Sequence, residues 1–463
     1  MIAAAVLVFF WIRGRGEGLI APPPAGPARF GAAAEAAPQV AILLHVLLAL
    51  VVVIATARLL GALFKALQQP PVIGEVIAGI VLGPSLLGHV APALYARLLP
   101  AAVAPHLSLL AQVGVILFLF LVGLELDTDA LRRGTHTTIA ISHASIVVPF
   151  LLGSGLALVL YPHLSSRDVP FTVFALFLGV SMSVTAFPVL ARILTDRGLQ
   201  STPLGRIALT CAAVDDVTAW CLLALVVGVV QARVGSAFAT IGMTLAYIAA
   251  VVLVVRPVVV RLAARVDREG RLSQGTMALV LVALLLSALA TEWIGIHALF
   301  GAFLLGAIVP HTSRIARELT ARLEDLVIVL FLPAFFAFTG MRTEIGLVRG
   351  AGQWLLCGAI VLVACLGKFG GSFVAARLTG LPWREASALG ILMNTRGLME
   401  LVVLNLGLDL KVLSPTLFTM LVLMAVVTTV MTAPLLHALG ADRGLEPLKA
   451  PEPGPVPAPE ISV

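Results

Sequence analysis

Two adjacent carboxylates, Asp215 and Asp216, lie in the middle of an apolar run that extends from Leu204 to about Val230. A charged aspartate at the centre of a membrane helix costs about 2.5–3.5 kcal/mol on insertion scales, and two like charges in a low dielectric disfavour each other further. Acids inside a membrane are typical of ion and proton pathways. The alternative is an acid pair kept protonated or ion-paired for packing, although apolar side chains would fill that space at lower cost. The pair therefore predicts an ion- or proton-binding site.

The composition indicates a membrane protein. Of the 463 residues, 60% are hydrophobic and 12% charged, whereas soluble domains are about 25% charged. A soluble enzyme is thereby excluded, no nucleophile–base arrangement is visible, and we expect no cofactor. The net charge of +6 requires no nucleic-acid partner, because cytoplasmic loops of membrane proteins are rich in Lys and Arg. The four cysteines lie in apolar runs without metal-ligand spacing and are interpreted as small buried side chains: Cys211, Cys221, Cys357 and Cys365.

Thirteen apolar segments from Val40 onward predict an all-α polytopic membrane protein with about 13 transmembrane helices. They span 40–64, 72–90, 107–126, 136–161, 170–195, 204–231, 236–263, 272–291, 297–313, 325–341, 351–378, 384–408 and 413–438. Residues 1–39 form an N-terminal extension, whose apolar start, Met1 to Ile12, is too short to span a bilayer. It could be a signal-like piece, a partial helix or a misplaced translation start. The Pro-rich residues 439–463 predict a disordered tail and no appended nucleotide-binding module.

The distribution of basic residues predicts the orientation. Connections after odd-numbered segments, together with the tail, carry eighteen Lys and Arg, against six in connections after even-numbered segments. Because cytoplasmic loops carry the excess, we predict a multi-pass protein of the cell (inner) membrane with a cytoplasmic C-terminus. Arg13, Arg15 and Arg29 then lie on the outer side, against the rule.

A weak internal repeat links the two halves of the chain. The sequence around Gly79 resembles that around Gly301, 222 positions later, and the sequence around Gly123 resembles that around Gly340, 217 positions later. The second and ninth segments are then equivalent, and a shift of seven helices inverts the copy relative to the membrane. Inverted repeats of this kind are typical of secondary transporters.

The fifth and twelfth segments are both interrupted. Ser183–Pro188 places a proline in mid-membrane, where it removes a backbone hydrogen bond and clashes with the preceding turn. Asn394–Gly397 interrupts the twelfth segment with polar residues, a cation and a glycine. Either alone could be an ordinary kink or a water-lined arginine, but paired interruptions in equivalent segments indicate a midplane binding site. Thr185 and unwound carbonyls near the breaks are candidate ligands of an ion bound there.

Further charges lie within the apolar runs. Lys368 is as unfavourable there as the aspartates unless it is paired, and its neighbouring glycines would let another helix approach. We therefore predict an Asp–Lys pair in which the other aspartate faces a cavity, since successive helical residues point about 100° apart. Arg396 and Glu400 are four apart and could pair with each other or act at the site. Glu75 is a candidate site residue or lies near the membrane face, and His297 fits a structural role better than a proton relay.

The motifs together resemble the monovalent cation:proton antiporter superfamily (Na⁺/H⁺ exchanger-like), in particular the plant cation/proton exchangers and their bacterial relatives. They are Pro71–Pro84, Leu121–Asp127, Ala213–Trp220, His297–Phe303 and Met393–Leu401. The resemblance covers about residues 40–438. It implies the inverted-repeat fold of Na⁺/H⁺ antiporters, in which a core domain holds two crossed broken helices and a panel domain forms a homodimer.

The resemblance also implies roles for individual residues. Asp216 matches the ion-binding aspartate, Asp215 a position that is Asp or Asn, and Lys368 the core lysine. Charge economy and this resemblance together predict that Lys368 pairs with Asp215. Many plant-type members have Asn at the position of Asp215, so the paired acids resemble those of electrogenic antiporters. The choice between Na⁺ and K⁺ and the stoichiometry stay open.

These features predict a secondary active antiporter that exchanges H⁺ for Na⁺ or K⁺ by competition at Asp216. A carboxylate is a hard oxygen ligand that binds either an alkali cation or a proton. A cation channel is one alternative, although a pore would require rings of carbonyls or acids from several subunits. A transporter of organic anions is another, in which Arg396 would hold a carboxylate. The expected partners are monovalent cations, protons, membrane lipid and a second copy of the chain, and no nucleic acid.

Overall fold

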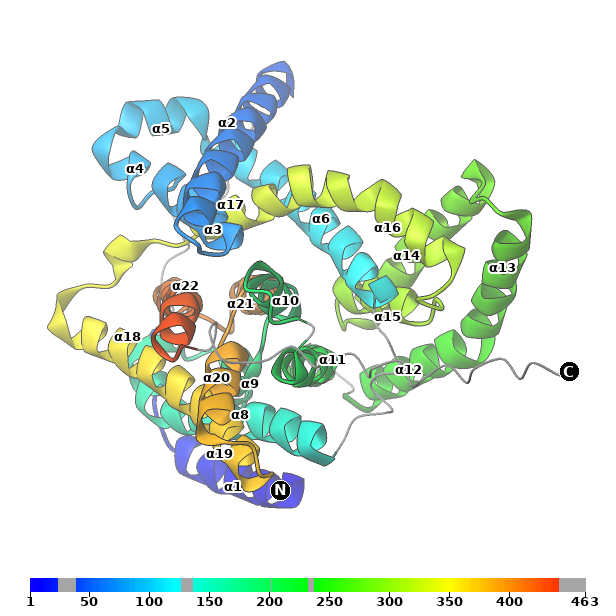
Figure 1. Ribbon diagram of the computed structural model, residues 1–463. Helices are drawn as coiled ribbons and strands as arrows, with labels where there is room; N and C mark the ends of the chain where they lie inside the picture. Colours follow the sequence, from blue (N-terminus) through cyan, green and yellow to red (C-terminus); the bar gives the residue numbers. More distant parts are fainter. Residues whose placement is uncertain (24–38, 126–135, 201, 232–236, 441–463) are drawn as a thin grey trace, which may run out of the picture.

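A computed structural model describes residues 1–23, 39–125, 136–200, 202–231 and 237–440, and in these ranges all regular structure is helical (Figure 1). Eleven helical runs are long and apolar enough to cross a membrane, and the bent pair α20 and α21 makes a twelfth. The short apolar helix α15 (Ala298–Ala307) corresponds to the ninth predicted segment. The predicted all-α polytopic class with about 13 segments is confirmed. The predicted disordered tail lies, from residue 441 on, outside the described residues.

The helices form two bundles, seen in Figure 1 as a lower-left group and an arc across the top and right. The lower-left bundle, called the core below, comprises α8 (His136–Leu164), α9 (Phe171–Ser183), α10 (Phe187–Asp196), α11 (Pro203–Gln231), α18 (Gly350–Cys365), η6 (Leu366–Gly370), α19 (Gly371–Leu378), α20 (Trp383–Met393), α21 (Leu398–Asp409) and α22 (Pro415–Ala438). The arc, called the panel, comprises α2 (Gln39–Ala66), α3 (Pro71–Leu82), α6 (Ala104–Glu125), α14 (Gln274–Ile294), α15, α16 (Arg314–Leu326), η4 (Val327–Phe331) and α17 (Leu332–Met341).

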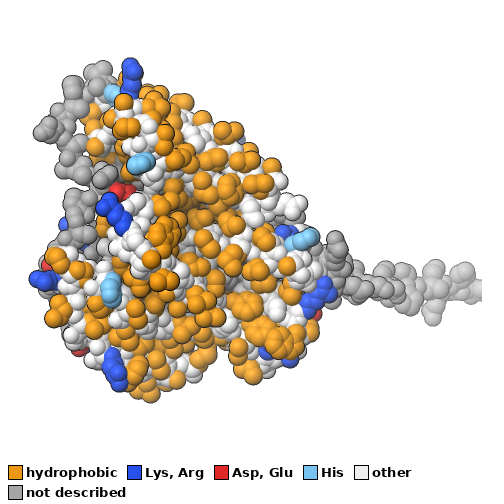
Figure 2. Space-filling model, turned by 90° about the vertical axis from the view of Figure 1, so that its left-hand side faces the viewer, with side chains coloured by type: hydrophobic (Ala, Val, Ile, Leu, Met, Phe, Trp, Pro, Cys, Tyr) orange, Lys and Arg blue, Asp and Glu red, His pale blue; other side chains and the backbone are white. Residues whose placement is uncertain are grey.

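The remaining elements connect these helices. Four short ones lie in connections: α4 (Leu87–Val90), α5 (Pro92–Leu98), η1 (Ala101–Val103) and η5 (Ile345–Leu347). Three more join the core to the panel between α11 and α14: α12 (Ala237–Ala250), the π-helical turn η3 (Val251–Val255) and α13 (Arg256–Glu269). Apolar side chains cover much of the surface in Figure 2, as expected of a molecule surrounded by lipid.

The predicted second segment, 72–90, agrees with the candidate span Pro71–Val90. Within that span α3 ends at Leu82, because the residue before Pro84 cannot easily stay helical, and α4 follows. The tenth segment was expected to begin at 325, but it is preceded by α16, whose charged face had hidden it from a hydropathy reading. The interpretation of the cysteines as buried is wrong for Cys221, which is exposed on α11, and incomplete for Cys365, which is half-buried.

The N-terminal extension contains a helix, α1 (Ile2–Gly16). It packs against the core, where the ring of Phe9 lies 5.9 Å from that of Phe150. Gly16 lies on the ring of Phe171 so closely that any side chain at this position would collide with it. The helix is therefore fitted to its neighbours rather than loosely attached.

Two helices of the panel, α3 and α15, carry the same pattern of glycine contacts. On α3, an ideal Cβ at Gly74 would lie 2.5 Å from Leu60 O of α2, and one at Gly79 would lie 2.1 Å from Ala337 O of α17. On α15, the corresponding distances are 2.2 Å from Gly301 to Ser287 O of α14 and 2.3 Å from Gly306 to Phe120 O of α6. In each repeat, the first glycine admits the preceding helix and the second admits a helix from the other half of the chain.

This packing confirms the inverted repeat and corrects its register. Gly74 is equivalent to Gly301 and Gly79 to Gly306, since each pair makes the same type of contact. The sequence comparison had matched Gly79 with Gly301, because two glycines in otherwise similar apolar strings align in more than one way. The predicted equivalence of Gly123 and Gly340 stands, as they face Gly306 and Gly79 across the two crossings.

Gly79→Ala is expected to lower the melting temperature of the purified protein. The new methyl group would meet the carbonyl of Ala337 in a helix crossing that cannot widen locally, and overpacking of this kind costs about 1–3 kcal/mol. Gly358→Ala is the matched control, since Gly358 is also helical but has no neighbouring atom within 4 Å. Alanine there should leave the melting temperature equal or slightly higher. Equal melting of both variants would contradict the close crossing.

Candidate functional site

Two broken helices meet in the core. Between α9 and α10 the residues Val184–Ala186 are unwound, and α20 and α21 are bent by 40° where they meet at residues 394–397. Pro188 lies in the first turn of α10, where its missing N–H is not needed by the helix. The backbone N–H of Ala186 donates to Thr395 O at 3.1 Å, so the two unwound segments hydrogen-bond directly to each other. Both predicted interruptions are thus present, and they lie side by side.

Asp215, on α11, is completely buried and saturated with donors. Its Oδ1 accepts from the hydroxyl of Ser142 at 2.8 Å, and its Oδ2 from the hydroxyls of Ser145 at 2.6 Å and Thr185 at 2.8 Å. The ammonium of Lys368 adds an ion pair at 3.1 Å to Oδ2. These contacts engage both carboxylate oxygens of Asp215 and fix the side chain in place.

Asp216 has the opposite environment. Its side chain is buried, and neither carboxylate oxygen has a hydrogen-bond donor in the described part of the chain. The backbone N–H of Phe187, at the start of α10, acts on it electrostatically but outside normal hydrogen-bond geometry. A helix N-terminus carries a partial positive charge, so negative charge at Asp216 has some compensation but no fixed partner.

Lys368 is brought to Asp215 by an irregular backbone. It lies in η6, a π-helical turn between α18 and α19, and it is fully buried. Ideal Cβ atoms at Gly367 and Gly371 would lie 2.8 Å from Pro149 Cα and Ala144 O of α8, so these glycines allow the close approach. The Nζ atom also donates to Ser145 O at 2.9 Å. The Asp–Lys pair inferred from charge is therefore formed with Asp215, and Asp216 is the other aspartate.

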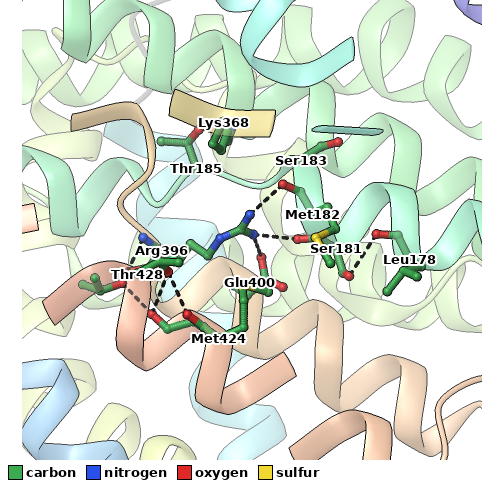
Figure 3. A network of polar contacts seen from close by, with 12 residues as sticks. Leu178, Ser181, Met182, Ser183, Thr185, Lys368, Arg396, Glu400, Met424 and Thr428 are labelled. Carbon is green, nitrogen blue, oxygen red and sulfur yellow. Dashed lines mark hydrogen bonds and ion pairs between the residues drawn. The ribbon is translucent and has the colours of Figure 1, made fainter. Parts of the chain in front are cut away.

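Arg396 connects the two breaks, as Figure 3 shows. Its Nη1 donates to Glu400 Oε2 at 2.7 Å and to Ser181 O at 2.8 Å, and its Nη2 donates to Met182 O at 2.7 Å. The two carbonyls belong to the last turn of α9, where a cation offsets the negative end of the helix dipole. Arg396 thus makes the predicted i,i+4 pair and also joins the twelfth segment to the fifth.

The other candidates have different positions. Thr185 lies beside the aspartates but its hydroxyl donates to Asp215, not to Asp216. Glu75 is buried on α3 in the panel. In the described residues no hydrogen bond or ion pair joins it to the charged residues of the core. His297 precedes α15, with its Nδ1 4.0 Å from Glu292 Oε2, which accepts from the backbone N–H of Ala298 at 2.8 Å. This arrangement fits a helix cap.

The sequence reading missed three hydroxyl groups of the site. Ser142 and Ser145 are three positions apart in the fourth apolar segment, which puts both on one helix face toward Asp215. Thr429 of α22 accepts from the backbone N–H of Arg396 at 3.0 Å and donates to its carbonyl at 2.8 Å, which satisfies the unwound backbone. The spacing of the two serines was the available signal.

Broken helices that cross beside buried charges within an inverted repeat define a secondary transporter. The family described as "Sodium/hydrogen exchanger, transmembrane" matches residues 49–438, and the chain belongs to that family. It is a multi-pass membrane protein and a secondary active antiporter of monovalent cations and protons, and its family consists of transporters rather than enzymes. The predicted family and activity are confirmed.

The relatives include antiporters of different lengths. The chain is 47% identical over 395 residues to the Na(+)/H(+) antiporter NhaS4 of Synechocystis, covering 85% of this chain and 96% of that protein. It is 40% identical over 415 residues to Cation/H(+) antiporter 20 of Arabidopsis thaliana, covering 86% of this chain but 49% of the relative. The fold resembles the sodium proton antiporter MjNhaP1 of Methanocaldococcus jannaschii with a TM-score of 0.63 at 13% identity, over 86% of this chain and 97% of that one.

Proposed function

We propose that H⁺ and a monovalent cation exclude each other at Asp216, while Asp215 is held in place by its donors and by Lys368 as a fixed neighbour. The contrast between the two carboxylates is the observation that supports this assignment. Asp215 has four donors, whereas Asp216 has none in the described residues. A buried carboxylate without a partner is unfavourable unless it binds a proton or a cation. Binding of either a proton or a cation therefore stabilises the buried Asp216.

The remaining ligands of the cation come from the nearby break. The hydroxyl of Thr185 donates its proton to Asp215, so its oxygen lone pairs remain available to a cation. Carbonyls of the unwound residues 184–186 would complete the oxygen shell that alkali cations require. The scheme uses only protein groups and the transported ions, and it needs no cofactor.

The two alternatives receive less support from the geometry. An organic anion would have to compete for Arg396, but both Nη atoms already donate to Glu400 and to the carbonyls at the end of α9. A channel would need a continuous polar path, whereas Asp215, Lys368, Arg396 and Glu400 are paired and buried within one bundle. Alternating movement of the core against the panel is therefore the favoured mechanism.

We place the protein in the cell (inner) membrane, with a cytoplasmic C-terminus, on the basis of the excess of basic residues in the connections after odd-numbered segments. We further propose a homodimer formed through the panel, by analogy of fold alone. Na⁺ is the first cation to test, because the full-length relative from Synechocystis is named a Na(+)/H(+) antiporter. K⁺ is the second, since a K(+)/H(+) antiporter of Saccharomyces cerevisiae is 35% identical over 391 residues, although the chain covers 46% of it.

Competition at one carboxylate gives a specific pH dependence. Where the site is mostly protonated, the deprotonated fraction falls about tenfold per unit decrease in pH, so the KM for the cation should rise about tenfold per unit. The maximal rate at saturating cation should stay nearly constant. The measurement uses purified protein in vesicles with equal pH on both sides, over about three pH units.

A separate regulatory proton site would give the opposite pattern, in which the maximal rate changes and the KM does not. A KM that does not vary with pH would contradict the shared site, even if the cation and proton fluxes were coupled. Because Asp215 and Asp216 are adjacent, any midpoint found in this experiment belongs to the pair.

A further inference from the structure

The panel and the core are joined on one face by Arg342, which follows α17. Its Nη1 donates to Asn405 Oδ1 at 3.0 Å and its Nη2 to Asp409 Oδ1 at 2.6 Å, both on α21 of the core. Its guanidinium also lies 5.9 Å from the ring of Phe418, on α22 of the core. One panel side chain thus contacts two core helices.

Asn405 makes the connection reciprocal. Its amide Nδ2 donates to Thr339 Oγ1 of α17 at 2.7 Å, while its Oδ1 accepts from Arg342. The ion pair to Asp409 alone would contribute little, because the Asp409 side chain is 45% exposed. Arg342 is 13% exposed, however, and it also makes a charged hydrogen bond to a buried amide. The contact is specific, yet it is limited enough to be broken and remade.

A second contact between the bundles lies deeper on the same side of the ion site. Trp220 is one helical turn beyond Asp216 on α11 and is buried. Its ring stacks on Phe303 at 6.3 Å and meets the edge of Phe300 at 5.7 Å, both on α15 of the panel. A small pocket is lined by Arg342, Asn405 and Asp409, together with Val115 of α6 and Leu299, which precedes Phe300 on α15.

We propose that these two layers form a gate that closes the ion site toward the outer face. The inner layer is Trp220 on Phe300 and Phe303, and the outer layer is Arg342 bound to Asn405 and Asp409. The core must move against the panel to expose the site on alternate sides, so contacts between the bundles on one face must separate when that face opens. The proposal depends on the orientation and the alternating mechanism proposed above.

The test measures opening without requiring transport. In a version whose four native cysteines are replaced, Val115→Cys places a thiol in the pocket, where Val115 is 2% exposed. A membrane-impermeant thiol reagent is added from outside to intact cells. Arg342→Gln should increase the labelling rate about tenfold, since a charged hydrogen bond typically changes an equilibrium by that factor or more. Asp409→Asn should increase it in the same direction.

Two controls separate gating from general loosening. Arg349→Gln removes a cation from the same connection, but the hydrogen bonds found for Arg349 in the described residues stay within its own segment: Nε donates to Gly346 O and the backbone N–H to Gln353 Oε1. It should leave labelling of Val115→Cys unchanged. A version that retains only the fully buried Cys211 should remain unlabelled when Arg342→Gln is added.

Each other outcome overturns the gate. Unchanged labelling in both Arg342→Gln and Asp409→Asn would show that the contact of Arg342 with α21 does not control opening. An equal increase with Arg349→Gln, or labelling of Cys211, would indicate unspecific loosening. Labelling only from the cytoplasmic side would overturn the outer placement. Failure of competition at Asp216 is detected separately, by the dependence of the cation KM on pH in vesicles.

Discussion

Asp216→Asn is expected to abolish cation-driven proton exchange while the protein still inserts and folds. Asparagine has nearly the same shape, but it neither releases a proton nor supplies a negative charge to a cation. Because no donor in the described residues binds Asp216, the substitution removes no hydrogen bond. We therefore expect a melting temperature equal to or above that of the unsubstituted protein, since a buried group that can carry an unpaired charge is removed.

The measurement compares proton flux driven by Na⁺ and by K⁺ in vesicles with purified protein, and thermal unfolding in detergent. Asp215→Asn is the matched contrast, because it leaves Lys368 without its anionic partner and should lower the melting temperature. Exchange close to the original rate in the Asp216 variant would contradict the assignment of Asp216 as the ion-binding group. A similar loss of stability in both variants would show that Asp216 has a structural partner.

Lys368→Ala is expected to cost about 3–5 kcal/mol of stability, the range found when one member of a buried ion pair is removed. Both Lys368 and Asp215 are fully buried, so no solvent compensates the charge left behind. Adding Asp215→Asn should restore much of the loss, because the orphaned charge disappears with it. The three variants and the original protein form a double-mutant cycle in thermal or denaturant unfolding.

Lys65→Ala is the control for loss of a lysine as such, because Lys65 is exposed at the end of α2. It should change stability by less than about 0.5 kcal/mol, as surface substitutions usually do. Additive losses for Lys368 and Asp215 would mean that the two groups are not coupled. Exchange in the double variant then reports whether Asp216 works without its charged neighbours.

Much of the architecture could be predicted because the membrane imposes strong constraints on sequence. Apolar segments must be long enough to span, so hydropathy locates them, and a proline or an Asn-Thr-Arg-Gly string inside such a segment marks a break. Charge also restricts the site. A buried lysine and a buried aspartate must find partners, which predicted an Asp–Lys pair, and the family resemblance pointed to Asp215 as the partner of Lys368.

What could not be predicted depended on weaker or ambiguous signals. Ser142 and Ser145 are single hydroxyls, which membrane helices tolerate by bonding to their own backbone, so their three-residue spacing was only a weak signal. The register of the repeat was ambiguous because each copy has two glycines five positions apart in a similar apolar string. Only the helices that they contact show that Gly74, rather than Gly79, corresponds to Gly301. Arg342 lay at a segment end, where an arginine usually requires no explanation.

The π-helical turn that carries Lys368 has a consequence for any redesign of this transporter. Such a turn holds one residue more than an α-helical turn, so the direction of the lysine depends on the number of residues in 366–370 as well as on its identity. Deleting one residue there would straighten the backbone into an ordinary helix and rotate the ammonium by about 100° relative to Asp215. Transplanting the ion site into another helical scaffold therefore requires the inserted residue together with the charges.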